Sequence, residues 1–457
     1  MFEKLREFIK KVRSLFNKND IKTVFGIDSA ISDEMSEKIV EWLNAYRGCA
    51  PWVDKYVKSM KIEESICREF ADVVMSEMTV SVSNKKLDAI VQKHISMLTE
   101  NLQSGIALGS FALKPLGEDK AEFVTADKFI VLSFTDDGKV DDIVFISKKI
   151  VAQNDVYYRF ERHTLDANGL TIKNYAYHSK TEGSLGAPCA LGEVYSWASL
   201  PEEITYPADR VDFGYYRNPI KNEIDGSFNG VSVFDGAMEL IEKADVQLGR
   251  LEWEFESGER AINVDVTALA PVPTKDKNGK TVFKAPKLND RLYRGLNLDA
   301  GNGELYKEFS PDFRDESIIN GLEQILRKIE FVVGLSYGDL SKTDTVEKTA
   351  EEIKHSKHRK YNRVKAIERN LQTCLEDFIY GLSFYNRLSK SGYTVNCDFA
   401  DSILTNEETE RKQDAQDVAM GAMPLWEYRM KWYKEDEQTA KSRVAESANE
   451  GTTEVLE

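Results

Sequence analysis

FVVGLSYGDLSKTDTVEKTAEEI, residues 331–353, joins two long helical patterns and decides how the rest of the chain is interpreted. In the pattern before it, apolar residues recur every three or four positions over 318–333, which predicts a helix with one apolar face. Gly334 and Gly338 relax the backbone restrictions that sustain a helix, so we expect the helix to end there. Residues 341–345 are small and polar and predict a loop.

The pattern after the loop predicts a second, longer helix. Asp344 with Glu347 three positions later is typical of a helix N-terminus, because the Asp side chain accepts the first free backbone N–H groups. The first half of this helix, 354–369, is basic, and one face is apolar. The apolar positions are Val364, Ile367, Leu371, Leu375, Phe378, Ile379 and Leu382.

Length and charge limit the classes of protein that fit. A chain of 457 residues predicts two to four domains, and its hydrophobic fraction of 42% is that of a globular protein. The formal net charge of −16 argues against a module that grips nucleic acid by neutralising phosphates. It is compatible with a passage whose negative walls keep DNA from sticking.

The compartment is predicted from what the sequence lacks. It contains no apolar run of about 18 residues, so we expect no transmembrane helix. No secretory signal is evident at the N-terminus, so we expect no export. Five scattered cysteines predict reduced thiols in a cytosolic product.

Residues 1–20 form a basic amphipathic pattern. Two interpretations stay open for it: a helix that binds a partner or a membrane surface, and a peripheral helix that packs on its own domain. The residues that share its apolar face are Leu5, Phe8, Ile9, Val12, Leu15 and Phe16.

In the next part of the chain, the spacing of apolar residues changes from a helical to an alternating pattern. Residues 32–110 predict mainly helices, with one strand at 78–83, and residues 111–215 predict antiparallel strands. Turn residues at 136–138 and 168–169 separate the strands of the second part. The expected fold class is therefore α+β. The strands are predicted near 129–132, 143–146, 156–160 and 170–177.

Another amphipathic helix is predicted at 235–256. A β-containing excursion separates it from the helix at 318–333, and within that excursion Asn278-Gly279 is a strong hairpin signal. Two amphipathic helices arranged in this way are expected to bury their apolar sides by packing side by side around a pore.

The C-terminal part predicts short elements. A turn and a strand are expected at 385–399 and a helix at 406–419. A break at 420–424 precedes two more helices, one from Leu425 and one near 436–446. Residues 447–457 are acidic and small, and we expect them to be disordered.

No motif for a cofactor or a catalytic metal is present. The sequence has no phosphate-binding glycine loop, no GxGxxG, no HExxH and no cysteine pair at zinc spacing, so we predict no cofactor, metal or catalytic residue. His355 and His358 lie three apart on the long helix, but their basic surroundings would repel a cation. Because acidic residues are abundant, a soluble nuclease or hydrolase with an unrecognised carboxylate site stays open as an alternative.

Three blocks of the sequence resemble bacteriophage portal proteins, in particular those of long-tailed phages of Gram-positive hosts. In residues 331–353, a helix ends in a Gly-Leu-Ser turn and a polar loop leads into Thr349-Ala350-Glu351-Glu352-Ile353. GVSVFDGAMELIEKADVQLGRLEWEFESGE, residues 230–259, is similar to the family's first stem helix and the turn before it. MGAMPLWEYRMKWYKEDEQTA, residues 420–440, is similar to its C-terminal helices.

The resemblance implies a portal fold, which the family builds from a wing, a stem, a clip, a tunnel loop and a crown. The implied parts are a mixed α/β wing at 1–234, a first stem helix at 235–258, a small β-containing clip at 259–311, a second stem helix at 312–334, a tunnel loop at 335–345, a long helix with a return to the wing at 346–403, a helical crown at 404–446 and a disordered tail at 447–457.

The function implied by the resemblance makes and breaks no bond. A homo-oligomeric, dodecameric ring would occupy one capsid vertex of the virion and let double-stranded DNA pass non-specifically during packaging and ejection. The implied partners are the terminase large subunit, head-completion or tail-adaptor proteins, and the major capsid and scaffolding proteins. The chain would be made in the host cytoplasm without membrane attachment. Another structural component of a phage head is a further alternative.

Three groups of residues take roles from this resemblance. The tunnel loop would present Ser336, Tyr337, Ser341, Lys342, Thr343 and Thr345 to the passing DNA. The basic run would contact an acidic face of a neighbouring subunit, with DNA phosphates as the second expectation and a solvated helix face as the third, through Lys354, Lys357, Arg359, Lys360 and Arg363. The clip would dock terminase near Lys275, Lys277 and Lys280, unless these lysines belong to an ordinary solvated hairpin.

Overall fold

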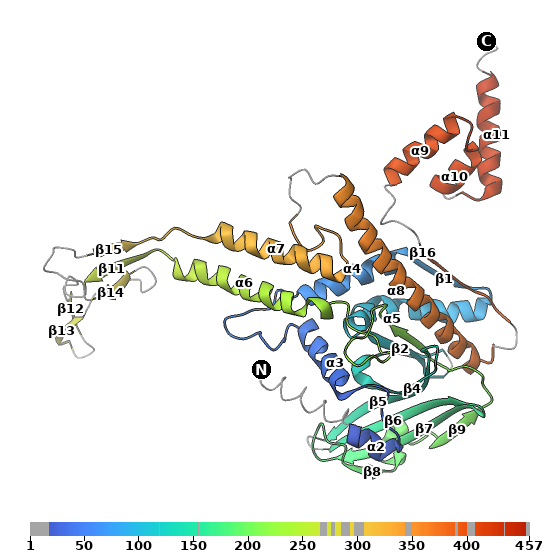
Figure 1. Ribbon diagram of the computed structural model, residues 1–457, viewed down its shortest axis with the longest axis horizontal. Coiled ribbons are helices and arrows are strands. Elements are labelled where there is room, and N and C mark those ends of the chain that lie inside the picture. Colours follow the sequence, from blue (N-terminus) through green and yellow to red (C-terminus); the bar gives the residue numbers. More distant parts are fainter. Residues whose placement is uncertain are drawn as a thin grey trace.

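Helices and strands both build the fold, which confirms the α+β prediction, and they are arranged as a body, a projecting two-helix arm and a group of C-terminal helices (Figure 1). The computed structural model describes residues 18–117, 119–152, 155–265, 272–275, 279–284, 293–296, 306–342, 350–388, 392–399, 407–433 and 435–453.

The N-terminal part of the body is helical, as predicted for 32–110. The side chains of Ser32 and Asn84 cap two of these helices by accepting backbone N–H groups. Trp42 and Phe70 are fully buried, because apolar residues at helical spacing face the common core. The helices are α2 (Lys18–Phe25), α3 (Asp33–Tyr46), α4 (Ile62–Glu77) and α5 (Lys85–Ala107).

The β region forms two antiparallel sheets, which confirms the prediction for 111–215. The larger sheet has the order β4-β5-β6-β7-β8, and β9 also pairs with β7. Its strands are β4 (Phe129–Phe134), β5 (Val140–Ala152), β6 (Asp155–Asp166), β7 (Gly169–Ser179), β8 (Ala187–Cys189) and β9 (Glu203–Tyr206). The smaller sheet has the order β10-β2-β3, with β10 (Gly214–Arg217), β2 (Ser110–Pro115) and β3 (Ala121–Thr125). Short 3-10 helices lie at η2 (Ala126–Lys128), η3 (Leu191–Glu193), η4 (Tyr195–Trp197) and η5 (Asp235–Ala237).

A third, two-stranded sheet joins distant parts of the chain. The predicted strand at 78–83 is β1 (Met78–Val82), and it pairs antiparallel with β16 (Val395–Phe399), the strand predicted after the long helix. Met78 lies opposite Phe399 and Val82 opposite Val395.

The arm consists of two long helices and small sheets at its tip (Figure 1). Strand β11 (Ala261–Asp265) pairs in parallel with β14 (Tyr293–Leu296) and antiparallel with β15 (Tyr306–Phe309). The predicted hairpin is formed by β12 (Val272–Lys275) and β13 (Thr281–Lys284), with Lys275 opposite Thr281. The helices are α6 (Met238–Ser257) and α7 (Asp315–Val333), as predicted.

The long helix α8 (Ala350–Tyr385) runs through the body. All seven apolar positions predicted for its buried face are buried. The helix lies very close to β10, because a Cβ on Gly214 would stand 2.1 Å from the backbone oxygen of Cys374. The predicted helix cap at Asp344 lies outside the described residues.

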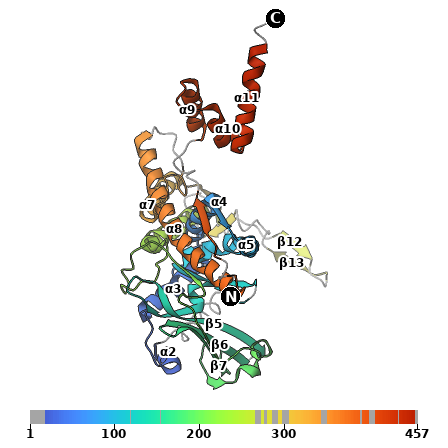
Figure 2. The same cartoon turned by 90° about the vertical axis from the view of Figure 1, so that its right-hand side faces the viewer.

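The C-terminal helices are α9 (Glu407–Ala419), α10 (Leu425–Tyr433) and α11 (Glu437–Thr453), and they stand away from the body in both views (Figures 1 and 2). The predicted break at 420–424 is confirmed. Of the tail for which disorder is predicted, residues 447–453 continue α11, and residues 454–457 lie outside the described residues. Residues 447–453 contain no proline, so each backbone N–H can continue the helical hydrogen bonding.

Candidate functional site

The two helices of the arm hold each other through specific polar contacts. Near the middle, the side-chain amide of Gln247 donates to the backbone oxygen of Ile318 at 3.1 Å. Toward the tip, the guanidinium of Arg314 donates to the two carboxylate oxygens of Glu254 at 3.1 and 2.7 Å. This pairing lowers the pKa of Glu254. The two helices therefore pack on each other within one chain, and they do not need a pore in order to pair.

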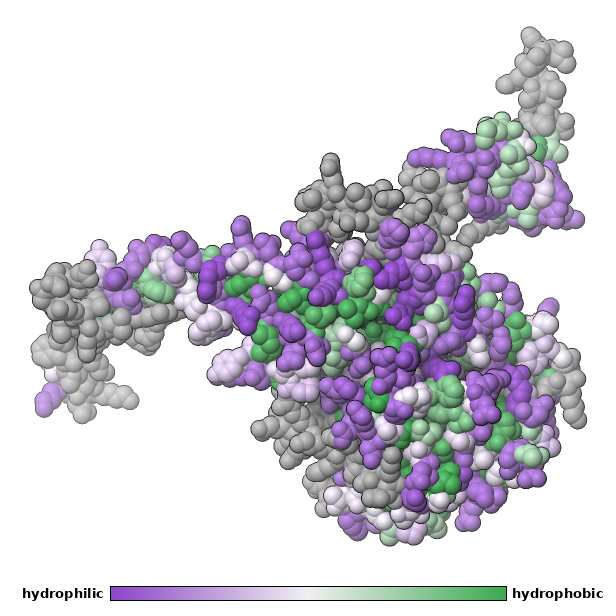
Figure 3. Space-filling model, in the orientation of Figure 1, coloured by the Kyte–Doolittle hydropathy of each residue, from purple (hydrophilic) through white to green (hydrophobic). Residues whose placement is uncertain are grey.

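Pairing leaves part of the apolar surface of the arm uncovered. Trp253 is 63% exposed and Phe331 is 57% exposed, and Figure 3 shows hydrophobic surface along the half of the arm nearer the body. Exposed apolar side chains that adjoin one another are candidates for an interaction surface. The other large apolar residues exposed on the two helices and at their junction with the tip are Phe255, Phe313, Ile319 and Val332.

The foot of the arm, where α7 ends, is organised by one buried carboxylate. Glu330 is fully buried, and its Oε1 accepts the backbone N–H groups of Gly338, Leu340 and Ser341 at 3.0, 2.7 and 2.8 Å. Its Oε2 accepts the Ser341 hydroxyl at 3.0 Å. Gly334 closes the helix with a φ of 93°, a left-handed conformation that favours glycine. These bonds wrap residues 338–341 around the end of α7.

The structure corrects the prediction that residues from Ser336 onward form a free loop. Ser341 is buried because it is bound to Glu330, and Tyr337 is half-buried beside Arg359. The backbone N–H of Ser336 donates to Asp339 at 2.8 Å. Of the predicted loop residues in the described ranges, Lys342 alone is exposed, and Thr343 and Thr345 lie outside them.

The basic run on α8 is also partly engaged within the chain. Lys360 is buried and pairs with Glu69 of α4 and with Asp339, whose carboxylate lies 3.1 Å away. Burial raises the pKa of Asp339 even beside this lysine. The prediction that Lys360 contacts a neighbouring subunit or DNA is therefore wrong, because its charge is neutralised inside the body.

Arg359 and Arg363 form one side of a groove of about 520 Å³ between the end of α7 and the first half of α8. Arg359 lies 4.8 Å from the ring centre of Phe331 and donates to the Leu335 backbone oxygen at 3.1 Å. Its Nε is buried, without a hydrogen-bond partner in the described part of the chain. Among the described residues, the groove wall contains no acidic side chain, and it consists of Phe331, Val332, Gly334, His355, His358, Arg359, Asn362, Arg363 and Ala366.

The groove is therefore a positive site on a protein of net charge −16. Burial lowers the pKa of Arg363, which donates to the backbone oxygen of Pro219 at 3.4 Å. Two guanidiniums that lack a carboxylate among the described groove residues suit an incoming carboxylate or phosphate. Of the remaining predicted residues, Lys357 is exposed, and the side chain of Lys354 lies outside the described part.

The lysines predicted at the tip are placed on the hairpin. Lys275 ends β12 and is exposed, and Lys280 precedes β13 and is exposed. Lys277 lies outside the described residues. The hairpin carries positive charge at the end of the arm farthest from the body (Figure 1).

Sequence reasoning missed a buried charge network in the body. Glu161 on β6 lies 2.6 Å from the Lys114 Nζ, 2.8 Å from Arg159 and 3.0 Å from the His163 Nε2. These three cations keep the pKa of Glu161 well below its usual range, against the opposing effect of burial. Residues 159, 161 and 163 lie at spacing two on one strand, so their shared face was a signal in the sequence.

The network continues to a second carboxylate. The His163 Nδ1 lies 2.8 Å from Asp212, which also accepts the Tyr385 hydroxyl at 2.6 Å. Burial opposes protonation of His163, but the two carboxylates outweigh it and raise its pKa to about 9. Both ring nitrogens of His163 are occupied, and the side chain is buried, so the network has the character of a structural ion cluster.

None of the helices in the described ranges has the length and apolarity needed to cross a bilayer. Within the same ranges, no group of three or more His, Cys, Asp or Glu residues could hold a metal ion. No protein-family model matches the chain, and no curated protein matches it.

Proposed function

We propose that the chain is a portal-type subunit, which assembles with copies of itself into a ring at a capsid vertex and lets double-stranded DNA pass. The single observation that carries the proposal is the arm: two paired helices project from the body and bear large apolar side chains that the chain itself does not cover. In a ring, each arm has a neighbouring arm on either side, which supplies that cover.

Hydrogen bonds at the foot of the arm fix the backbone from which the proposed DNA-facing loop would start. Gly338, Leu340 and Ser341 are bound to Glu330, and the backbone N–H of Lys342 is bound to Glu323. The part of the proposed loop that would face DNA therefore begins after Lys342. The first proposed partner of the basic groove is an acidic face of the neighbouring subunit, and DNA phosphate is the second. The hairpin at the tip is the proposed docking surface for terminase and later for head-completion or adaptor proteins.

Particle size and shape test the proposal directly. The purified chain is expected to elute from a sizing column as a large ring and to show a central hole in negative-stain images. Trp253→Asp puts a charge on the uncovered arm surface and is expected to prevent the ring while leaving the monomer folded. Tyr195→Asp is the control, because Tyr195 is also a large exposed aromatic residue, at 97% exposure, but lies on the body. A wild-type chain that stays monomeric under all assembly conditions contradicts the proposal.

Function in the assembled particle is tested through the loop. Deletion of residues 343–345 is expected to spare the ring and to reduce the amount of DNA packaged. Normal genome filling in this variant would refute the role of the loop.

The alternative of a hydrolase or nuclease has one observation in its favour, the Glu161–His163–Asp212 network. A general base needs a free nitrogen or oxygen that reaches the substrate, and both nitrogens of His163 are already bonded. We therefore assign the network to stability. Hydrolytic activity that disappears in His163→Gln would reverse this assignment.

A further inference from the structure

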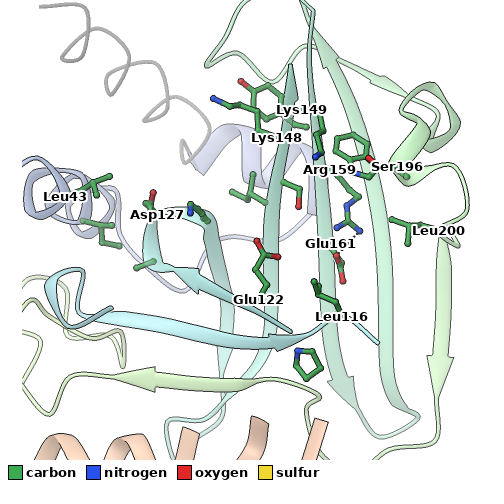
Figure 4. Close-up of a pocket in the computed structure, with 18 of the residues that line it drawn as sticks. Leu43, Leu116, Glu122, Asp127, Lys148, Lys149, Arg159, Glu161, Ser196 and Leu200 are labelled. Atoms are coloured by element: carbon green, nitrogen blue, oxygen red, sulfur yellow. Dashed lines mark ion pairs between the residues drawn. The ribbon is translucent and has the colours of Figure 1, made fainter. Parts of the chain in front are cut away.

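A large cavity in the body has no role in the proposed function. It encloses about 850 Å³ between α3 and the larger sheet (Figure 4). Ile39 and Leu43 of α3 form an apolar wall on one side, and Trp197 and Leu200 form an apolar wall on another. A space of this volume, in which apolar walls accompany a few polar groups, is typical of a binding site for a small molecule.

The charged side chains that line the cavity are mostly basic. Among the described residues of the lining, five are basic and three are acidic, on a chain whose net charge is −16. The basic residues are Arg47, Lys128, Lys148, Lys149 and Arg159. The acidic residues are Glu122, Asp127 and Glu161. The lining is therefore positive where the chain as a whole is negative, which favours an anion over a cation as the occupant.

Two of these charges already have strong partners within the chain. Lys148 pairs with Glu182 at 2.5 Å. The carboxylate of Glu161 is held by the three cations described above. Lys149, the next residue on β5, is exposed and has no ion pair in the described part of the chain. Its charge is therefore available to an occupant of the cavity.

The register of the larger sheet brings three polar side chains to one corner of the cavity. Ser147 on β5 lies opposite Arg159 on β6, and Lys149 lies opposite residue 157. Opposed residues, and residues two apart on a strand, share one face of a sheet, so these three side chains face the same way. All three line the cavity. Diagonal neighbours of this kind lie about 7–8 Å apart, which allows one oxyanion to reach both Lys149 and Arg159.

The guanidinium of Arg159 keeps a donor for such an oxyanion. Its Nη1 donates to the Asn174 side chain at 3.0 Å and lies 2.8 Å from Glu161. Its Nε is buried and has no hydrogen-bond partner in the described part of the chain. A buried donor without an acceptor is unfavourable, and a carboxylate or phosphate oxygen supplies the acceptor that an arginine binds best.

The buried charges behind Arg159 also favour an anion. The pKa of His163, raised to about 9, keeps this side chain protonated at neutral pH. The cluster then contains three cations, Lys114, Arg159 and His163, and two carboxylates, Glu161 and Asp212. One anionic group in the cavity balances the cluster.

The other acidic side chains limit the ligand to a single anionic group. Glu122 lies on β3 and Asp127 on η2, and Figure 4 shows Asp127 across the cavity from Arg159. Lys128 follows Asp127, and Arg47 ends α3, so the charge on this side is mixed. Carboxylates here repel a second anionic group, which disfavours a polyanion such as nucleic acid.

We propose that the cavity binds a small amphipathic anion, with its carboxylate or phosphate head at Arg159 and Lys149 and its apolar body between α3 and Trp197. This site goes beyond the proposed function, and binding to it does not depend on the assembly of a ring.

Calorimetric titration of the full-length chain with ten-carbon probes tests the head and the body separately. Decanoate and decyl phosphate are expected to bind once per chain and about tenfold more tightly than decan-1-ol, which has the same body without a charge. Tighter binding of one of the two anions identifies the head group as carboxylate or phosphate. Inorganic phosphate, which has the charge without the body, is expected not to displace decanoate.

Three results of this titration overturn the proposal. They are the absence of binding by both anions, equal affinity for the anions and decan-1-ol, and displacement of decanoate by inorganic phosphate.

Variants place the head group in the cavity. Lys149→Glu reverses one charge of the corner and is expected to weaken decanoate binding about fivefold, with decan-1-ol binding unchanged. Lys86→Glu is the matched control, because Lys86 is an exposed lysine on α5 outside the cavity, and it is expected to leave both affinities unchanged. Arg159→Gln is expected to abolish the preference for decanoate over decan-1-ol, and circular dichroism checks that this variant folds.

A folded Arg159→Gln chain that keeps the preference overturns the proposal. Where Arg159→Gln does not fold, Lys149→Glu decides, since its side chain is exposed. Equal decanoate affinity in Lys149→Glu and Lys86→Glu then overturns the proposal.

Discussion

The body and the arm differ in how far their side chains find contacts within the chain. In the body, the buried charge of His163 has partners inside the chain, because it lies between Glu161 and Asp212. On the arm, Trp253 and Phe331 remain largely exposed after α6 and α7 have paired. The comparison teaches that buried contacts in the body stabilise the single chain, whereas the arm leaves apolar side chains exposed, and we propose association for that surface. Glu330 marks the boundary, because it closes the foot of the arm with bonds of the kind found in the body.

The largest effect is expected where a buried charge in the body loses its partner. Asp212→Ala leaves protonated His163 and the Tyr385 hydroxyl with one partner fewer in a buried site, so we expect a loss of about 4 kcal/mol in the free energy of unfolding. Urea unfolding measures it. Glu202→Ala, an exposed control on the same body, is expected to stay within about 0.5 kcal/mol. A loss below about 1 kcal/mol for Asp212→Ala would show that the network contributes little.

The same network predicts a pH dependence. The pKa of His163 is raised to about 9 in the folded chain, above an unfolded value of about 6.5, so its stabilising effect is complete below the unfolded pKa and is lost as the pH rises through the folded pKa. From His163 alone, the free energy of unfolding is expected to fall by about 1 kcal/mol between about pH 6 and pH 7.5, a range that lies below the usual cysteine pKa of about 8.5. Unfolding curves at both pH values measure the fall, and His163→Asn should reduce it by about that amount. An unchanged slope in that variant would assign the pH dependence to other groups.

A smaller effect is expected at the boundary. Glu330→Ala leaves three backbone N–H groups and the Ser341 hydroxyl without their acceptor, and we expect a loss of about 2 kcal/mol together with faster amide exchange at residues 338–341. Glu323→Ala is the matched control on the same helix, because Glu323 accepts the N–H of exposed Lys342 at 2.8 Å. Equal exchange in the two variants would mean that Glu330 does not fasten the loop.

The smallest effect on the single chain is expected on the arm itself. Trp253→Ser is expected to change the unfolding of the monomer by less than about 0.5 kcal/mol, since the side chain is already exposed. We expect the variant to weaken the association between chains, and sedimentation of the wild type and the variant at matched concentration measures this change. A large loss of monomer stability would show instead that Trp253 stabilises the single chain, as buried residues of the body do.

The long elements were predictable because each repeats a simple pattern. Apolar residues at helical spacing placed α7 and the buried face of α8, and Asn278-Gly279 placed the hairpin at the tip. The strands at 78–83 and within 385–399 were both predicted, but their pairing was not, because strand pairing across three hundred residues leaves no mark in either segment.

The site was less predictable, because side chains of one type take different roles. Glu330 is one of 77 acidic residues, and its spacing on α7 does not reveal that its carboxylate collects the N–H groups of the following turn. Lys360 belongs to a basic run that reads as exposed, yet Glu69 and Asp339 neutralise it. Both outcomes depend on residues brought together by the fold.

The pairing of β1 with β16 has a mechanical consequence. The chain reaches the C-terminal helices through β16, so any tension that those helices receive enters the body through a ladder of five residue pairs, from Met78–Phe399 to Val82–Val395. β1 continues at both ends into helices, α4 and α5, which spread the load across the helical layer. The ladder therefore resists displacement of β16, and of the C-terminal helices that follow it, away from the helical part of the body.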